Sequence, residues 1–291
     1  MHQCEINLIS SILNGPIDIS ILMPGPAFRT DPQEFYENQK KYKVLWVLHG
    51  GNNDRYCFLN ATNLKRHVDG RDVIVVMPNA LNSDFANHPE FADGYYYQDF
   101  FFRELMPYVY HTFPASDAPE DNFIVGFSMG AAAAWMYALS HPGKFGAIAP
   151  IGSGLKDYSE LEKFREMKSG EFRAAAEADR MLFTTGYGPA ASGIKPKEIN
   201  MVAKYPTVGD FLDSPEHTQY TFEKAAKAGT VPKVYLPCGT KDGMYAKVLK
   251  LKELAQNLGV ESITFDFVED GVGNYEFVDS MLPKTLDFFG L

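Results

Sequence analysis

The sequence predicts an α/β protein with a doubly wound, mostly parallel sheet, and three observations lead to that prediction. Short, uninterrupted apolar runs recur along the chain, as expected for strands that are covered on both faces. Stretches with helical periodicity separate these runs, so that strand and helix alternate. Two N-terminal segments instead alternate apolar and polar residues. We therefore expect antiparallel edge strands at the start of the sheet.

The individual elements follow in order along the chain. Apolar residues occupy every second position in 4–12 and 17–23, and a turn at Asn14-Gly15-Pro16 joins these two segments. Six apolar runs predict parallel strands, at 44–48, 73–77, 123–125, 145–151, 234–236 and 263–268. Four further stretches predict helices, at 97–111, 128–140, 245–258 and 275–289.

The alternation of strand and helix fails between residues 155 and 231. Helical pieces such as 159–180 alternate there with segments that contain Gly and Pro, such as 185–189. We interpret the stretch as an insertion within a single domain of residues 1–291. Because it follows a parallel strand, it should overhang the edge of the sheet where ligands bind. It is either a lid over a substrate pocket or a segment that only packs over the hydrophobic core.

Composition and charge argue against several classes of function. The chain has 291 residues, 45% of them hydrophobic, and a net charge of -10. This acidic balance argues against nucleic-acid and membrane binding, because both need a cationic face. The cysteines, Cys4, Cys57 and Cys238, show neither a disulfide framework nor metal-binding spacing. No leader-like segment begins the chain, so we expect a cytoplasmic protein, with secretion after removal of a leader as the alternative. The oligomeric state stays open.

A Gly-x-Ser-x-Gly motif at 126–130 makes Ser128 a candidate nucleophile. The motif directly follows the strand predicted at 123–125 and directly precedes an alanine-rich helix start. In such a nucleophile elbow, small residues two positions before and after the serine relieve crowding in a sharp strand-to-helix turn. The serine hydroxyl is thereby exposed.

Backbone N–H groups beside Ser128 are expected to form an oxyanion hole. The first N–H groups of a helix have no partner and favour developing negative charge, which predicts the N–H of Met129 as one donor. The sequence Leu-His-Gly-Gly-Asn at 48–52 follows another predicted strand. We expect the second donor from Gly51, with Asn52 in reserve. A tight loop that only needs glycine flexibility is the alternative for this turn.

These residues resemble the esterase D branch of the α/β-hydrolases, which includes feruloyl, acetylxylan and short-chain acyl esterases and S-formylglutathione hydrolase. The resemblance covers most of the chain. It rests on Leu-His-Gly-Gly at 48–51, Gly-Tyr-Tyr-Tyr at 94–97 with Glu104-Leu105, Gly-Phe-Ser-Met-Gly at 126–130, His-Pro-Gly-Lys-Phe at 141–145 and Cys-Gly-Thr-Lys-Asp at 238–242. In that family the Cys-Gly-x-x-Asp strand end presents the triad acid, which matches Asp242. An ordinary turn or helix-capping aspartate is the alternative.

The histidine of a Ser-Asp-His triad is missing from its expected loop. The family carries Gly-x-His-x-Trp there, whereas residues 269–279 contain no histidine; aligned on Tyr275, the position falls on Gly273. Of the seven histidines, only His88 and His217 lie in irregular segments from which they could reach Ser128. Three explanations stay open: an engineered His-to-Gly replacement, a natural pseudoenzyme, or a base supplied by Asp270 or Glu269.

The resemblance implies a serine carboxylesterase for short-chain or aromatic acyl esters of small molecules or oligosaccharides, with no cofactor and no metal. Without the histidine we expect strongly impaired activity. In subtilisin, loss of the histidine alone costs about as much as loss of the whole triad, and roughly 10³–10⁴-fold catalysis over water remains. The competing hypotheses are a non-catalytic protein that binds an acylated ligand over Ser128, and an acyltransferase.

Overall fold

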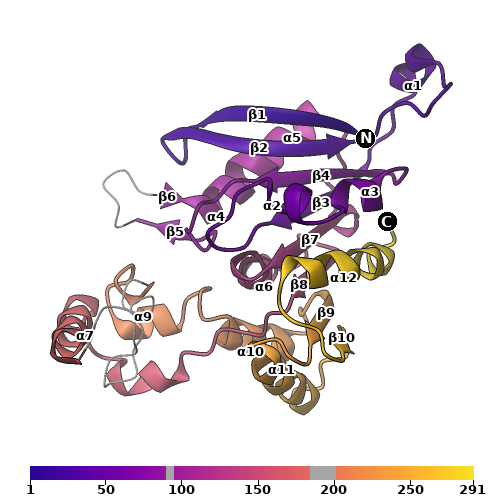
Figure 1. Cartoon of the computed structure of the whole chain (residues 1–291). Coiled ribbons are helices and arrows are strands. Elements are labelled where there is room, and N and C mark those ends of the chain that lie inside the picture. The colour runs from indigo at the N-terminus through magenta and orange to yellow at the C-terminus, as the bar shows by residue number, and fades with distance from the viewer. Residues whose placement is uncertain (90–94, 184–200) are drawn as a thin grey trace.

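The computed structural model describes residues 1–89, 95–183 and 201–291. Within these ranges, eight strands form one twisted sheet in the order β1-β2-β4-β3-β7-β8-β9-β10 (Figure 1). Its strands are β1 (His2–Ser10), β2 (Gly15–Met23), β3 (Lys43–Leu48), β4 (Val73–Pro78), β7 (Asn122–Phe127), β8 (Ala147–Ile151), β9 (Lys233–Gly239) and β10 (Ile263–Val268). A small separate ribbon pairs β5 (Asn87–His88) with β6 (Tyr95–Tyr96).

The pairing of the strands confirms the predicted fold class. β3, β4, β7, β8, β9 and β10 run parallel to their neighbours, and β2 joins them by antiparallel pairing with both β1 and β4. Only β1 is therefore an edge on the N-terminal side. β10 is the opposite edge of the sheet. Its residues are mostly half-buried, whereas its apolar run predicted a strand covered on both faces.

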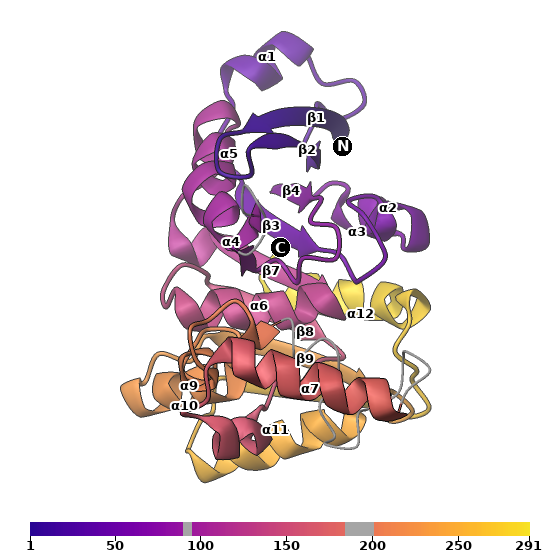
Figure 2. The same cartoon turned by 90° about the vertical axis from the view of Figure 1, so that its left-hand side faces the viewer.

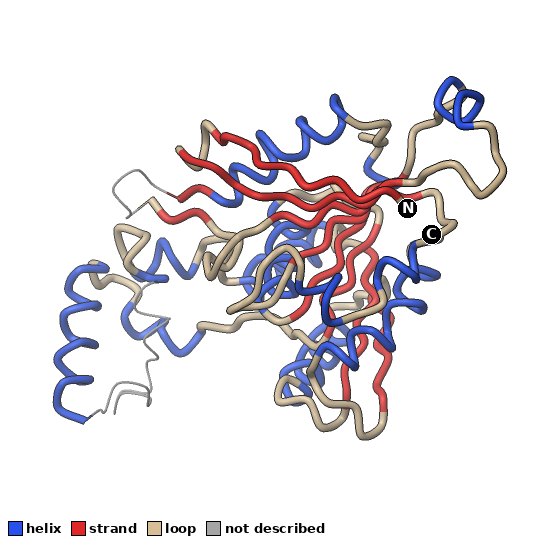
Figure 3. The backbone as a smooth tube through the Cα atoms, turned by 45° about the horizontal axis from the view of Figure 1, so that its top comes forward, coloured by secondary structure: helices blue, strands red, loops and turns tan. Residues whose placement is uncertain are grey.

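Helices cover both faces of the sheet (Figure 3). One layer contains α4 (Tyr97–Phe100), a π-helical turn (Phe101–Leu105), α5 (Met106–Thr112), α6 (Met129–Ser140), α10 (Thr218–Ala228) and α11 (Tyr245–Asn257). The other contains α2 (Cys57–Ala61), α3 (Leu64–Val68) and α12 (Tyr275–Phe288). Successive residues of β3 alternate between the two layers, because strand side chains point to opposite faces. For example, Trp46 packs in the first layer and Val47 in the second.

The four predicted helices are present, and several short elements were not predicted. α1 (Pro32–Glu37), α2 and α3 have five or six residues each, which is too short for helical periodicity to reveal them. α1 buries none of its residues and lies on a loop that projects from the body near the N-terminus (Figure 1). No helix in the described ranges combines the length and apolar character needed to cross a bilayer.

Within the stretch expected to be an insertion, α7 (Ser169–Phe183) and α9 (Val208–Leu212) protrude from the body of the molecule at the left of Figure 1, and α7 is nearest the viewer in Figure 2. A separate hydrophobic cluster holds this part together and includes Leu161, Phe172 and Phe211. The helix predicted at 159–180 is divided into a 3₁₀ turn (Ser159–Phe164) and α7. Segment 185–189 lies outside the described residues.

Two further contacts define how the insertion is built. The ammonium of Lys204 and the carboxylate of Glu216 form a buried ion pair of 3.0 Å. α10 instead belongs to the main body, where the ring of Phe222 contacts that of Trp135 on α6 at 6.0 Å between centroids. The insertion therefore starts as a separate unit and ends as part of the layer that covers the sheet.

Candidate active site

Ser128 lies at a sharp turn between β7 and α6. Its backbone has φ 55° and ψ -114°, in the left-handed region that non-glycine residues rarely adopt. The side chain is exposed and makes no capping hydrogen bond with α6. A β-carbon on Gly126 would lie 2.2 Å from the Gly130 carbonyl oxygen, and one on Gly130 would lie 2.0 Å from the Leu48 carbonyl oxygen. Both glycines are therefore required by close approach of main chain to main chain.

The Gly50-Gly51 turn packs directly beside this elbow. A β-carbon on Gly50 would lie 3.6 Å from Cβ of Ser128. The N–H of Asn52, the reserve candidate for an oxyanion donor, is occupied here: it donates to Oδ1 of Asn82 at 2.7 Å. The N–H of Gly51 has no hydrogen-bond partner among the described residues. It is thus the N–H in this turn that is left for a ligand.

His49 fixes this turn and is not a catalytic base. The Ala80 N–H donates to Nε2 of His49 at 2.9 Å, so Nδ1 carries the proton that faces the Gly50 carbonyl oxygen at 2.8 Å. Burial lowers the pKa of His49, which keeps the ring neutral. Both ring nitrogens are occupied by backbone groups.

Asp242 lies in the loop after β9, which is tied to the loop after β10. The Lys241 N–H donates to the Gly271 carbonyl oxygen at 3.0 Å, and a β-carbon on Gly239 would overlap the main chain of Gly271. The Met244 N–H donates to Oδ1 of Asp242 at 2.8 Å. These contacts hold one carboxylate oxygen and bring the two loops into register.

Two glycines make room for the Asp242 carboxylate. A β-carbon on Gly273 would lie 2.3 Å from Oδ2 of Asp242, and one on Gly152 would lie 2.8 Å from the same oxygen. Gly152 has a φ of 63°, whereas the φ of Gly273 lies outside the left-handed region. The φ at 273 therefore does not require glycine, but a side chain there would point at the acid and could fit only if the carboxyl group moved.

None of the seven histidines has a hydrogen bond or ion pair with Ser128 or Asp242 in the described structure. The Nε2 atom of His88 lies 2.7 Å from the Ser83 carbonyl oxygen. Nδ1 of His217 lies 2.8 Å from the Leu212 carbonyl oxygen, inside the insertion. The remaining five have the following environments: His2 contacts Tyr36, His49 the Gly50-Ala80 backbone, His67 Asp279 and His141 Phe102, and His111 is exposed at the end of α5. The two histidines left open by the sequence are therefore held by other groups.

The acidic residues considered as a replacement base are also accounted for. An oxygen of Asp270 lies 2.8 Å from Nζ of Lys241, with both side chains exposed. Glu269 is exposed as well. The structure brings neither carboxylate into the cavity beside Ser128.

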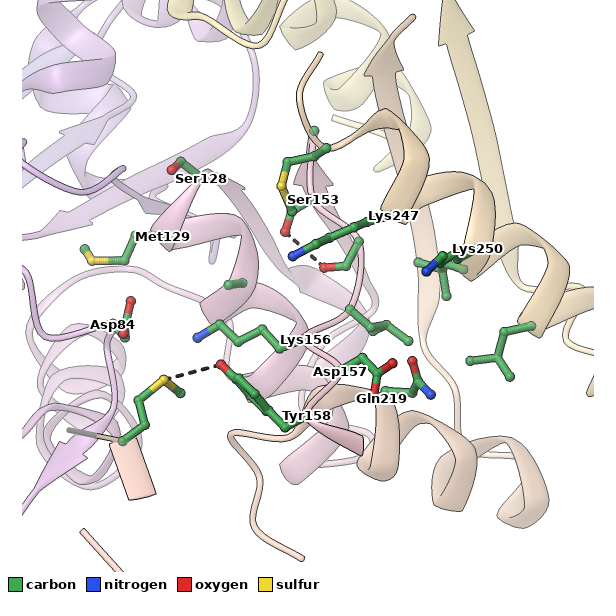
Figure 4. Close-up of a pocket in the computed structure, with 18 of the residues that line it drawn as sticks. Asp84, Ser128, Met129, Ser153, Lys156, Asp157, Tyr158, Gln219, Lys247 and Lys250 are labelled. Carbon is green, nitrogen blue, oxygen red and sulfur yellow. Dashed lines mark hydrogen bonds between the residues drawn. The ribbon is translucent and has the colours of Figure 1, made fainter. Parts of the chain in front are cut away.

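A cavity of about 690 Å³ opens beside Ser128 (Figure 4). Its floor includes Ser128 and Met129, and one wall is α11. The facing wall comes from the segment after β8 and from the insertion, including Tyr158 and Met201, whose hydroxyl and sulfur lie 3.3 Å apart. The volume suits a small organic ligand. No cluster of three or more potential metal ligands occurs in the described part of the chain.

Tyr275 is a site residue that the sequence presented only as an alignment point. Its hydroxyl accepts a long hydrogen bond of 3.4 Å from the Gly50 N–H and lies 3.0 Å from Sγ of Cys57. Its ring contacts that of Phe127, next to the nucleophile candidate, at 5.0 Å between centroids. Burial raises its pKa, so the hydroxyl stays protonated. Tyr275 thus connects the loop that holds Gly273 to the turn that holds Gly51.

Comparisons with curated proteins find esterases. Esterase Rv1288 of Mycobacterium tuberculosis is 26% identical over 124 residues, which cover 40% of this chain and 26% of that protein. The match thus spans about a quarter of that longer relative. An acetyl esterase of Caldicellulosiruptor saccharolyticus is 21% identical over 289 residues and is matched along 98% of its length, against 99% of this chain.

Solved structures share the whole fold. The fluorophosphonate-binding serine hydrolase FphF of Staphylococcus aureus has a TM-score of 0.73 and 20% identity, with 99% of this chain and 98% of that chain covered. S-formylglutathione hydrolase FrmB of the same organism has a TM-score of 0.69 and 21% identity, with 99% of both chains covered. The α/β-hydrolase fold implied by the resemblance is thereby confirmed. A family model described as "Putative esterase" matches residues 10–280, and the chain therefore belongs to this esterase family.

Proposed function

We propose that this chain is a serine carboxylesterase whose nucleophile is Ser128 and whose general base is absent. The N–H groups of Met129 and Gly51 stabilise the oxyanion that forms when an ester carbonyl is attacked. Asp242 has the role of orienting a base at position 273, where glycine supplies none. Activity is accordingly low, because nothing accepts the serine proton. The name of the similar acetyl esterase supports short-chain acyl esters as substrates. The name of a further solved structure of the same fold, a ferulic acid esterase with a TM-score of 0.65 and 19% identity, supports aromatic acyl esters.

The observation that carries this proposal is the direction of a side chain at position 273. A β-carbon on Gly273 would point straight at the Asp242 carboxylate, and the backbone there needs no glycine. A histidine at this position would have its acid partner within reach. Because this β-carbon would lie only 2.3 Å from Oδ2 of Asp242, the carboxylate must move from the position it has when residue 273 is glycine.

The test is Gly273→His, assayed by release of 4-nitrophenol from 4-nitrophenyl acetate. We expect hydrolysis to rise at least ~100-fold, as is usual for a positioned general base. Gly273→Ala is the matched control, because it displaces the Asp242 carboxylate without adding a base. Ser128→Ala in the Gly273→His background should abolish the gain. A gain that survives Ser128→Ala, or that Gly273→Ala also produces, would show that the roles are wrongly assigned.

A second function, ligand binding without turnover, has one specific observation in its favour. The cavity beside Ser128 is well formed, although no histidine contacts that serine in the described structure. A binding protein would hold an acylated ligand equally well with Ser128→Ala, and Gly273→His would give no hydrolysis. Measuring affinity and turnover on the same two variants separates this function from the esterase.

A further inference from the structure

We propose that the ester bound beside Ser128 carries an ionised acidic group, such as a carboxylate, in addition to its ester group. We propose that Lys247 binds this ionised group. This inference rests on the proposed function, because it takes the cavity beside Ser128 as the ester site. It adds a substrate class, anionic esters, to the short-chain and aromatic acyl esters proposed above. Lys247 is then a specificity residue that distinguishes charged from neutral esters.

One face of α11 forms a wall of this cavity. Lys247, Lys250, Leu251 and Leu254 all line it, and their spacing of three, four and seven residues is that of a single helix face. The wall thus combines two ammonium groups with two apolar side chains. Such a surface suits a ligand that has both a charged end and a carbon chain or ring.

Lys247 has no partner for its charge. Among the described residues it forms no ion pair and no hydrogen bond, and the same holds for Lys250. Five lysines have carboxylate partners within 4 Å: Lys40, Lys41, Lys204, Lys241 and Lys284. Exposed lysines such as Lys65 and Lys224 have none among the described residues, so Lys247 and Lys250 differ from these in lining a cavity. In a protein with a net charge of -10, unpaired cations in a cavity make this site attractive to an anion that the rest of the surface repels.

The fold holds Lys247 close to the nucleophile. It lies five residues after Asp242, in the first turn of α11, and long helical side chains point back towards the helix N-terminus. A β-carbon on Gly154 would lie 2.9 Å from the Lys247 carbonyl oxygen, so the start of α11 packs against the segment that follows β8. Figure 4 shows the Lys247 side chain reaching from α11 into the cavity, with its ammonium on the Ser128 side of Lys250. Lys250, one turn further on, is about 5 Å more distant along the helix axis.

The acidic residues of the cavity lie on other elements than α11. Asp157 and Glu160 come from the insertion, and Asp84 comes from the loop after β4. Asp157 accepts a hydrogen bond of 2.9 Å from the Ser159 N–H and lies 3.7 Å from Nε2 of His217. A third lysine of the lining, Lys156, lies on the same segment as Asp157 and has an interaction of its own, so the lysines of the cavity without a partner among the described residues are the two on α11. An anionic group on the ligand is expected to face α11.

The test measures binding of matched ester pairs to full-length Ser128→Ala protein, which cannot turn them over. One pair carries the charge on the acyl side: mono-4-nitrophenyl glutarate against 4-nitrophenyl pentanoate. The other carries it on the alcohol side: 4-acetoxybenzoate against its methyl ester. We expect the anionic member of at least one pair to bind about fivefold more tightly by titration calorimetry, the scale of a partly exposed ion pair.

Substitutions on α11 test whether Lys247 causes the tighter binding of the anionic esters. Lys247→Met should abolish it and leave the neutral esters within about twofold of their original affinity, whereas Lys247→Arg should retain it. Lys252→Met is the matched control, because Lys252 lies on the same helix with its ammonium 5.3 Å from the Phe267 ring and outside the cavity. Equal binding of charged and neutral esters in both pairs overturns the proposal, and so does a Lys252→Met effect as large as that of Lys247→Met. Either result leaves the Gly273→His test of esterase function unaffected.

Discussion

Asn122, at the start of the strand that ends in the nucleophile elbow, offers a sharp test of what stabilises this fold. Its side chain is fully buried and makes four hydrogen bonds. Oδ1 accepts from Nε1 of Trp46 at 3.0 Å and from the Tyr110 hydroxyl at 2.8 Å. Nδ2 donates to the carbonyl oxygens of Ser116 at 3.0 Å and Ala118 at 2.8 Å. The amide thus connects β3, α5 and the loop before β7.

Asn122→Ala removes all four bonds and leaves the Trp46 N–H without an acceptor in a side chain that is 0% exposed. An unsatisfied buried donor costs about 1–3 kcal/mol, and the Ser116 carbonyl oxygen adds a smaller loss, whereas the Ala118 carbonyl oxygen still accepts from the Asp121 N–H. We expect the free energy of unfolding to fall by about 2–4 kcal/mol. Tyr110→Phe removes one bond, from a half-buried hydroxyl, and should cost about 1 kcal/mol.

Urea unfolding of the two variants and the parent protein, followed by tryptophan fluorescence and circular dichroism, measures these losses. The urea concentration at the midpoint of unfolding should fall in both variants. The slope of the unfolding free energy against urea concentration should stay constant, because the surface exposed on unfolding is unchanged. If Asn122→Ala costs no more than Tyr110→Phe, then the Asn122 network does not stabilise the fold and the reasoning is refuted.

Two further predictions concern buried ionisable groups. Lys204→Met leaves the Glu216 carboxylate unpaired in the insertion and should cost about 3–5 kcal/mol of unfolding free energy, most of which Lys204→Met with Glu216→Leu should recover. If the double variant lost as much unfolding free energy as Lys204→Met alone, that result would contradict the prediction. Because burial lowers the pKa of His49 below its usual value near 6.5, the His49 imidazole binds a proton in the unfolded state before it does so in the folded state as the pH falls. Stability should therefore drop between pH 7.5 and 5.5 more steeply in the parent than in His49→Gln, and equal urea midpoint shifts in the two proteins would contradict it.

The sequence revealed the parts of this molecule that depend on local pattern. Apolar runs located the parallel strands, and the Gly-x-Ser-x-Gly spacing located the turn at Ser128, although the need for glycine at 130 comes from the Leu48 carbonyl oxygen at the end of β3, which is distant along the chain. Short helices such as α2 and α3 escaped detection because five residues carry no periodicity. Contacts between distant segments were equally hidden. The Asn82 side chain that occupies the Asn52 N–H lies 30 positions further along the chain.

The same limit explains the site residues that were missed. Tyr275 and Cys57 are 218 positions apart, and only the folded chain brings them together beneath Gly50. Lys247 belongs to an ordinary-looking helix with mixed charge. Its role in the proposal arises from an ammonium that has no partner among the described residues and from the cavity it enters, and neither property is encoded in the residues next to it.

The ordinary backbone at Gly273 has an evolutionary consequence. A glycine in the left-handed region would bar most replacements, but the φ of this one does not require glycine, and what a side chain there would meet is the carboxyl group of Asp242, which would have to shift. On the proposed mechanism, the passage between a feeble and a competent hydrolase requires the exchange of a single residue and no rebuilt loop. Hydrolytic activity could therefore be gained or lost in evolution by substitution at this one position, while the fold and the cavity beside Ser128 are kept.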